Sequence, residues 1–244
     1  MILHPLTKKP LKWVFFDLDN TLWDFDGNAH AALKVLFERH QLEYHTGYQE
    51  EQFIHIYKDV NAAYWKRYEK GEVSKDVLRT ARFTDTFALM GLPPELYPPN
   101  VWDEYLDICP RMTVLIPGAR ECLAFMKAHA KIGILTNGFE LTQKIKLAES
   151  GLDQWIDYVQ SSEAFGSAKP SKEFFDAALE FAQISSEECI YIGDNWHTDV
   201  EGGMNAGILT YRYCYQDSEA NIAIESHPLF GGEVRSLTQW CQSF

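Results

Sequence analysis

After Pro117 the chain alternates between short apolar segments rich in β-forming residues and longer helical segments. We predict strands at Lys131–Leu135, Tyr158–Gln160, Cys189–Ile192 and Ile208–Tyr213. We predict helices at Gly118–Ala128, Leu141–Glu149, Ser171–Ala182, Val200–Asn205 and, near the C-terminus, Ser236–Gln242. Strands that alternate with helices pair in parallel through right-handed crossovers. The sequence therefore predicts an α/β domain built on a parallel sheet.

A further strand is predicted at Trp13–Phe16, and a long helical stretch separates it from the other strands. Residues Asp24–Asn28, at the start of this stretch, are typical of a turn. The stretch shows aromatic residues at helical spacing, with helices predicted at Ala31–His40, Glu50–Tyr68, Ser74–Met90 and Pro99–Cys109. We therefore expect two domains: an α/β core of residues 1–23 and 110–244, and an all-helical insertion of residues 24–109.

The net charge limits the partners that the protein can have. Lys and Arg number 22 and Asp and Glu number 35 in 244 residues, which gives 22 minus 35, or −13, at pH 7. An acidic chain repels nucleic-acid backbones and anionic lipids, so neither a nucleic-acid polymer nor a membrane is expected as a partner. A small phosphorylated metabolite remains compatible, provided that a metal ion and a few cationic side chains offset its charge locally.

The cysteines and the chain's apolar segments bear on the compartment. Five cysteines lie far apart in the sequence without a CxxC pair, which favours reduced thiols in a cytoplasmic protein. The polar N-terminus does not have the character of a signal peptide, and no apolar segment approaches the length of a membrane span. We expect a cytoplasmic protein, with the oligomeric state open between a monomer and a homodimer.

Two pairs of carboxylates follow predicted strands. Asp17 and Asp19 come directly after the first strand, and Asp194 and Asp199 come after Cys189–Ile192. Carboxylates beside a buried strand are unfavourable unless they are paired, and Mg²⁺ is a natural partner because it prefers oxygen ligands. Taken alone, either pair is more often a polar turn or a helix cap than a metal site.

Two further polar segments lie at the start of predicted helices. Thr136-Asn137-Gly138 follows a strand, and backbone amides at such a turn can bind an anion, although an ordinary helix cap has the same composition. Lys169 precedes Pro170, which fits near a helix start, and a lysine in that place is usually only solvated. The side chains of Asp17, Thr136 and Asp194 would all lie at the carboxyl edge of the sheet, where open α/β sheets bind ligands.

Together, and in this order, the four segments resemble the motifs of the haloacid dehalogenase (HAD) superfamily. The segments are Asp17-x-Asp19-x-Thr21, Thr136-Asn137, Lys169-Pro170 and Gly193-Asp194-x4-Asp199, and the resemblance runs from Trp13 to the end of the chain. It implies a Rossmann-like core with an inserted helical cap that closes over the active site.

The resemblance also implies a role for each carboxylate. Asp17 would be the nucleophile that forms an aspartyl-phosphate, and Asp19 would act as general acid and then as general base. Mg²⁺ would be bound by the Asp17 carboxylate, the Asp19 backbone carbonyl and Asp194, with Asp199 as a further ligand or a support of the ligands. Dehalogenases of the superfamily lack the second aspartate and do not use Mg²⁺, so Asp19, Asp194 and Asp199 favour a phosphatase.

The other motif residues would stabilise the phosphoryl group. The resemblance implies that Thr136, the Asn137 amide and Gly138 hold phosphoryl oxygens, and that Lys169 neutralises the charge of Asp17 and the phosphate. Charge in phosphoryl transfer spreads over three oxygens, so a metal ion and a cation on opposite sides both stabilise the transition state.

Within the superfamily the chain is similar to the bacterial pyrimidine 5′-nucleotidases with a helical cap. The shared segments are Lys131-Ile132-Gly133-Ile134, Thr136-Asn137-Gly138-Phe139, Ser162-Glu163, Gly166, Lys169-Pro170, Gly202–Gly207, Gly71 and Arg82-Phe83. This similarity implies a nucleoside monophosphate as substrate. The alternative is another small phosphate ester, such as a sugar phosphate or phosphoglycolate.

Several residues could contact the leaving group of such a substrate. Trp23 and Phe25 follow the nucleophile segment, and Arg82 lies in the helical insertion. Aromatic residues of the insertion, at positions 57, 64, 65, 68 and 83, could stack on a base, although helical aromatic stripes are more often a domain core. A base held mainly by stacking would give loose specificity.

Two less favoured functions are also compatible with the sequence. His30 lies near the place of a histidine used by sugar phosphomutases of the superfamily, although a histidine on a helix surface is the commoner arrangement. A non-enzymatic HAD-fold binding protein is the alternative from another functional class. The full set of Asp17, Asp19, Thr136, Lys169, Asp194 and Asp199 argues against it, because binding alone does not require all six.

Overall fold

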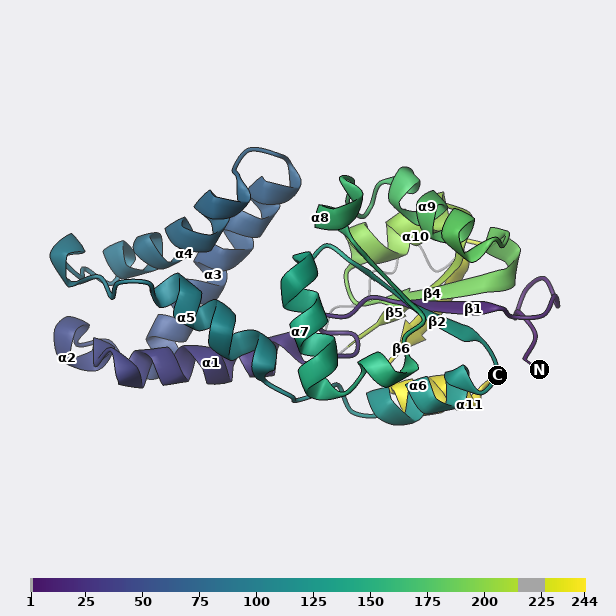
Figure 1. Cartoon of the computed structure of the whole chain (residues 1–244), viewed down its shortest axis with the longest axis horizontal. Helices are drawn as coiled ribbons and strands as arrows, with labels where there is room; N and C mark the ends of the chain where they lie inside the picture. Colours follow the sequence, from purple (N-terminus) through teal and green to yellow (C-terminus); the bar gives the residue numbers. More distant parts are fainter. Residues whose placement is uncertain (1, 215–226) are drawn as a thin grey trace. The chain divides into compact units, whose positions relative to one another are not determined.

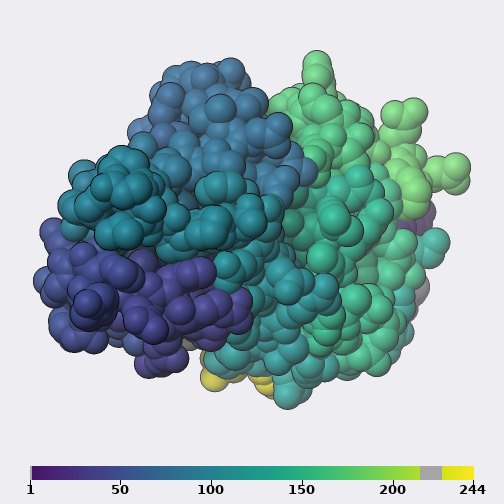
Figure 2. Space-filling model, turned by 60° about the vertical axis from the view of Figure 1, so that its left-hand side comes forward, coloured from purple at the N-terminus to yellow at the C-terminus, as the bar shows by residue number. Residues whose placement is uncertain are grey.

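The computed structural model describes residues 2–214 and 227–244. Contacts between residues divide the chain into two compact units, one of Met1–Phe25 with Thr113–Phe244 and the other of Asp26–Met112. The elements of each unit are labelled in Figure 1, and the surface of each can be followed by residue number in Figure 2.

The first unit is built on a six-stranded sheet with the strand order β3-β2-β1-β4-β5-β6, in which all neighbouring strands are parallel. The strands are β1 (Trp13–Phe16), β2 (Lys131–Thr136), β3 (Tyr158–Ser161), β4 (Cys189–Gly193), β5 (Leu209–Tyr213) and β6 (Phe230–Val234). The predicted α/β fold with a parallel sheet is therefore confirmed.

Helices cover both faces of this sheet, with α9 and α10 on one side and α6 and α11 on the other (Figure 1). The helices of the unit are α6 (Ala119–Lys127), α7 (Glu140–Ser150), α8 (Ser162–Phe165), α9 (Lys172–Ala182), α10 (Gly202–Asn205) and α11 (Leu237–Gln242). Short 3-10 turns lie at Asp153–Trp155 and Ser186–Glu188, and a π-helical turn at Trp196–Glu201 precedes α10.

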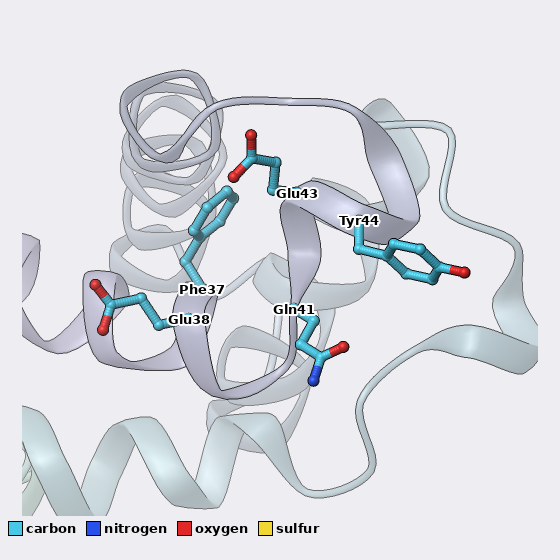
Figure 3. A pocket seen from close by; sticks show the side chains of 5 residues that line it. All are labelled: Phe37, Glu38, Gln41, Glu43 and Tyr44. Atoms are coloured by element: carbon cyan, nitrogen blue, oxygen red, sulfur yellow. The ribbon is translucent and has the colours of Figure 1, made fainter.

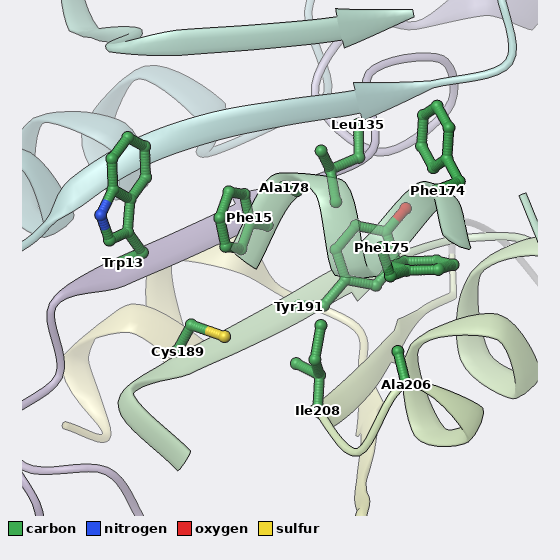
Figure 4. Packing of buried hydrophobic residues seen from close by; sticks show 10 residues of the cluster. All are labelled: Trp13, Phe15, Leu135, Phe174, Phe175, Ala178, Cys189, Tyr191, Ala206 and Ile208. Atoms are coloured by element: carbon green, nitrogen blue, oxygen red, sulfur yellow. The ribbon is translucent and has the colours of Figure 1, made fainter. Parts of the chain in front are cut away.

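Strand β1 is buried on both faces, which explains its uninterrupted apolar sequence. On one face Phe15 belongs to a cluster with Phe175 of α9 and Tyr191 of β4, whose rings meet edge to face at 5.3 Å (Figure 4). On the other face Phe16 meets the Trp240 ring of α11 at 6.1 Å. Full burial of each such side chain contributes about 1.5–3 kcal/mol. This burial fixes the position of the strand that leads into Asp17.

Strand β6 is not predicted from the sequence, because Gly231 and Gly232 lower its β-propensity. The structure pairs it with β5 through Tyr211–Gly232 and Arg212–Glu233. Phe230 begins this edge strand and contacts the Trp196 ring at 5.5 Å.

The second unit is entirely helical, and residues 26–112, all of which the structure describes, contain no strand, as predicted. Its helices are α1 (Phe25–Arg39), α2 (Leu42–Thr46), α3 (Glu50–Glu69), α4 (Lys75–Leu89) and α5 (Val101–Ile108), with 3-10 turns at Pro94–Leu96 and Cys109–Arg111. The Phe53 ring of α3 stacks at 5.7 Å on Phe37 of α1 and at 6.4 Å on Phe87 of α4. These aromatic contacts join three helices in one core.

The expected turn at Asp24–Asn28 is wrong, because α1 already begins at Phe25. Asp26 lies in the first turn of the helix, where a carboxylate is stabilised by the helix dipole. The short helices α2 and α8 were also not predicted, since each spans only five or four residues. Among the described residues, no helix has the length and apolar character needed to cross a membrane.

Candidate active site

The carboxyl ends of three adjacent strands bring the predicted polar residues together. The Asp17 amide donates to the carbonyl of Ile192 at 2.9 Å, which extends the pairing of β1 and β4 by one residue. Thr136 ends β2 on the other side of β1, and Asp194 follows β4. The site is therefore positioned by the most buried strands of the sheet.

Lys169 is the centre of a buried hydrogen-bond network. Its Nζ donates to Oδ1 of Asp17 at 2.6 Å, to Oδ1 of Asp199 at 2.6 Å and to the Tyr191 hydroxyl at 3.1 Å. Tyr191 in turn donates to Oδ1 of Asp199 at 2.7 Å. The Lys169 side chain is only 2% exposed. A buried ammonium is stable here because it contacts two carboxylates.

The backbone of Lys169 is fixed by Asn137. The Asn137 side chain donates from Nδ2 to the Lys169 carbonyl at 3.0 Å and accepts from the Lys169 amide at Oδ1, at 2.9 Å. The structure thus uses the Asn137 side chain to join the loop after β2 to the loop that carries the lysine.

The π-helical turn after β4 positions Asp199. The Asn195 side chain caps this turn by accepting from the Thr198 amide at 3.0 Å, and the Asn195 amide donates to Oδ2 of Asp199 at 3.0 Å. Gly193 is required beside it, because a Cβ there would overlap the Asp199 carboxylate. π-helical turns are rare and occur often at functional sites.

Three carboxylates gather without enough positive charge to balance them. Asp17, Asp194 and Asp199 each offer an oxygen atom, and these oxygens all lie within 4.8 Å of one another. If all three carboxylates were ionised, the group together with Lys169 would carry three negative charges and one positive charge, or −2 in total. Burial, together with the neighbouring carboxylates, raises the pKa of Asp17 to about 7 and the pKa of Asp194 well above its usual range. Oxygen ligands with a net charge of −2 fit a divalent cation such as Mg²⁺.

The Thr136 hydroxyl is oriented by two donors. Its Oγ1 accepts from the Gly138 amide at 3.0 Å and from Nε2 of Gln143 at 2.7 Å. Because both lone pairs are used, the hydroxyl proton is the part of the group that can donate to a bound oxygen. Gly138 was predicted to contact substrate, and in the structure its amide orients this hydroxyl.

Asp19 belongs to a second network, separate from that of Lys169. Its Oδ1 accepts from Nζ of Lys146 at 2.6 Å, and its Oδ2 accepts from Nε2 of Gln143 at 2.8 Å. The Lys146 ammonium also lies over the rings of Trp23, at 4.5 Å, and Phe25, at 5.4 Å. The two aromatic residues predicted to contact substrate thus support the lysine that binds Asp19.

In the helical unit, Arg82 and two aromatic candidates are buried in the core, and His30 lies at the surface. Arg82 is 4% exposed, donates to Oδ1 of Asn61 at 2.8 Å and lies over the rings of Tyr57 and Tyr105. Tyr57 and Phe83 of the aromatic stripe are buried in the core of this unit. His30 lies on α1 near two glutamates of α3, with Nε2 3.6 Å from Oε1 of Glu51.

A surface hollow of about 590 Å³ lies on the helical unit (Figure 3). It is lined by Phe37, Glu38, Gln41, Glu43 and Tyr44. Two carboxylates and no cationic side chain among these residues make it unsuited to a phosphate group. The cations and hydroxyl of the sheet edge, by contrast, suit a phosphate.

A family model of haloacid dehalogenase-like hydrolases matches residues 11–207. The chain belongs to this family. The structure gathers Asp17, Lys169, Asp194 and Asp199 at one place.

Individual relatives of this HAD hydrolase are similar over most of their length. The pyrimidine 5′-nucleotidase YjjG of Escherichia coli is 34% identical over 81% of this chain and 84% of its own. The pyrimidine 5′-nucleotidase PynA of Streptococcus pneumoniae is 30% identical over 83% of each chain. The magnesium-bound structure of the HAD-hydrolase YfnB from Bacillus subtilis superposes with a TM-score of 0.80 at 26% identity, covering 96% of this chain and 99% of its own.

Three residues of the HAD hydrolase's site were not predicted from the sequence. They are Gln143 and Lys146 of α7 and Tyr191 of β4. Tyr191 lies within an apolar strand and resembles any core aromatic residue. Gln143 and Lys146, three residues apart on one helix, resemble a solvated helix face, and only their burial, at 0% and 4% exposure, sets them apart.

Proposed function

We propose that the protein is a Mg²⁺-dependent 5′-nucleotidase that hydrolyses nucleoside monophosphates, with a preference for pyrimidines, through an aspartyl-phosphate on Asp17. The observation that carries the chemistry is the buried cluster in which Asp17 and Asp199 share the Lys169 ammonium beside Asp194. The substrate class is supported by the two relatives named pyrimidine 5′-nucleotidases.

In the first half of the reaction, an Asp17 carboxylate oxygen attacks phosphorus in line. The bond from phosphorus to the ester oxygen breaks, and Asp19 gives the departing oxygen a proton, so that a neutral alcohol leaves. Thr136 donates its hydroxyl proton to a phosphoryl oxygen, and Lys169 offsets the charge that gathers on Asp17 and the phosphoryl group.

In the second half, water attacks the phosphorus of the aspartyl-phosphate. Asp19, now a carboxylate, takes a proton from this water, and the bond from phosphorus to the Asp17 oxygen breaks. Inorganic phosphate leaves, and both aspartates return to their starting forms. Two easier displacements replace one difficult displacement.

Asp17, Asp194 and Asp199 would hold the metal ion, together with the Asp19 backbone carbonyl that the family resemblance implies. The bound ion would supply positive charge next to the phosphoryl oxygens. The gathering of three carboxylates beside a single ammonium is the observation that favours a divalent over a monovalent cation.

The substrate is tested by measuring phosphate release, with Mg²⁺, from UMP, dUMP, dTMP, AMP, GMP, sugar phosphates, phosphoglycolate and pyrophosphate. We expect kcat/KM for the pyrimidine monophosphates to exceed that for the other compounds by about tenfold or more. If a sugar phosphate or phosphoglycolate is the best substrate, the phosphatase chemistry stands and the nucleotidase proposal is wrong.

Removal of the metal ion is expected to abolish turnover. After treatment with EDTA, phosphate release should fall at least about 100-fold and return on addition of MgCl₂. Mg²⁺ should also raise the Tm of the EDTA-treated protein, because it binds the folded state. Asp194→Asn should reduce this rise in Tm, whereas turnover that is insensitive to EDTA would contradict the proposal.

We further propose that the protein works in the cytoplasm on a small phosphorylated metabolite. All five cysteines are free and buried in the structure, which suits a reducing compartment. The net charge of −13 argues against nucleic-acid polymers as substrates.

A further inference from the structure

Gln143 and Lys146 lie three residues apart on α7, so their side chains leave the same face of the helix. Both contact Asp19, one at each carboxylate oxygen, at 2.8 Å and 2.6 Å. A carboxylate whose two oxygens accept from two different side chains is restrained in both of its dihedral angles. The Asp19 side chain is therefore held in one orientation, although it is 28% exposed.

Lys146 is buried and pairs with Asp19. Its side chain is 5% exposed, and within residues 2–214 and 227–244 its ion pair is with Asp19. The ammonium also makes cation–π contacts with the rings of Trp23 and Phe25. A buried ammonium without a carboxylate is strongly unfavourable, so the lysine and Asp19 fix each other's positions.

Gln143 connects Asp19 to the residue that contacts the phosphoryl group. Its Nε2 carries two protons, and the acceptors within reach are Oδ2 of Asp19 and Oγ1 of Thr136. Gly138 leaves the space for this amide, because a Cβ there would overlap Nε2 of Gln143. One amide group thus sets the distance between the proposed acid and base and the proposed phosphate-binding hydroxyl.

We propose that Lys146 and Gln143 are positioning residues that hold the ionised Asp19 side chain for the second half of the reaction. In that step Asp19 takes a proton from the water that attacks the aspartyl-phosphate, and the bond from phosphorus to Asp17 breaks. Both donors contact a carboxylate, which is the form of Asp19 that accepts a proton. This inference rests on the proposed function, since it takes Asp19 as the base of a phosphatase.

Kinetics with the substrate 4-nitrophenyl phosphate distinguish the formation of the aspartyl-phosphate from its hydrolysis. Its leaving group is a weakly basic phenolate that departs without a proton, so kcat/KM reports formation of the aspartyl-phosphate without help from Asp19. Hydrolysis of that intermediate, which does require the base, contributes to kcat but not to kcat/KM. A residue that positions Asp19 for the second half should change kcat and leave kcat/KM nearly unchanged.

We expect Lys146→Met to lower kcat on 4-nitrophenyl phosphate by about 10- to 100-fold and to change kcat/KM by less than about threefold. Met retains the length and the apolar contacts with Trp23 and Phe25 but not the ion pair. In stopped-flow measurements the variant should release a burst of about one nitrophenolate per active site, followed by slow turnover.

Gln143→Leu is the second variant. It should lower kcat in the same way, and also lower kcat/KM, because Thr136 loses a donor as well. The matched control is Lys144→Met on the same helix, since Lys144 is 63% exposed and pairs with Glu140 on the surface. This control should retain wild-type constants.

An unchanged kcat in Lys146→Met, or an equal fall in kcat and kcat/KM, would overturn the inference. An unchanged kcat would mean that the ion pair between Lys146 and Asp19 does not affect hydrolysis of the intermediate. An equal fall in both constants would mean that Lys146 has a general structural role. Failure of the proposed function itself gives a different pattern: the wild-type protein releases no phosphate from any monoester, or Asp17→Asn still gives a burst.

Discussion

Asp17→Asn is expected to lower phosphate release by at least about 10⁴-fold, with KM and folding little changed. Asparagine has the shape of aspartate, but its amide oxygen is a poor nucleophile and cannot form a stable phosphoryl ester. The substituted side chain can still accept a hydrogen bond from Lys169, which in the wild-type protein is 2.6 Å from Asp17 and 2.6 Å from Asp199.

The folded state should tolerate this change because the site has too many carboxylates rather than too few. Burial raises the pKa of Asp17 to about 7, so its ionised form is less favourable in the metal-free protein than that of an exposed aspartate. A neutral side chain at position 17 removes one of three carboxylates that repel one another in the metal-free protein. Loss of activity would therefore reflect loss of the nucleophile and not loss of the fold.

A matched control is Asp176→Asn, in which the same substitution is made at an exposed ion pair with Lys172. Such surface pairs contribute about 0–1 kcal/mol, so the control should keep wild-type activity and Tm. Phosphate release should be followed under saturating substrate, with folding checked by circular dichroism. Asp17→Asn with more than about 1% of wild-type turnover would show that Asp17 is not the nucleophile.

The sheet and the ends of its strands were predictable because they follow from local patterns. A strand buried on both faces must be apolar throughout, and β1 and β4 have this character up to the residues at which their carboxylates follow. Parallel strands carry their carboxyl ends to one edge, so Asp17, Thr136 and Asp194 could be expected to meet there. Strand β6 was missed because it pairs only at the sheet edge and contains two adjacent glycines.

The partners of the catalytic groups could not be predicted in the same way. Lys146 contacts Asp19 across 127 positions of sequence, and Lys169 contacts Asp17 across 152. Nothing in the pattern of α7 separates Lys146, which is buried, from Lys144, which is exposed two positions earlier. That difference depends on the tertiary packing of α7 against the segment after β1, which local periodicity does not contain.

The structure gives each proposed catalytic carboxylate its own buried lysine. Asp17 contacts Lys169, and Asp19 contacts Lys146, and both lysine side chains are at most 5% exposed. The two lysines differ in their remaining surroundings. Lys169 has a second carboxylate, whereas Lys146 has the faces of two aromatic rings. Lys169 is therefore tied to the charge of the metal cluster, and its removal should affect metal binding.

Lys169→Met is expected to lower turnover by about 10³-fold and to destabilise the metal-free protein by about 3–5 kcal/mol. Without the ammonium, the carboxylates of Asp17 and Asp199 face each other in a buried site with no cation between them. Although burial alone would lower it, the two carboxylates raise the pKa of Lys169 above its usual range, so the native protein holds this lysine charged. Its loss removes a full positive charge.

Mg²⁺ should compensate for part of this loss, because it neutralises the same carboxylates. The rise in Tm on adding Mg²⁺ to the metal-free protein should therefore be larger for Lys169→Met than for the wild-type protein. Lys172→Met, which removes an exposed lysine paired with Asp176, is the matched control and should change stability by less than about 1 kcal/mol. An equal or smaller rise in Tm for Lys169→Met would show that the lysine and the metal ion do not share these carboxylates. A variant that folds only when Mg²⁺ is present would support the same shared neutralisation, because the divalent ion would then supply the charge that the buried site needs.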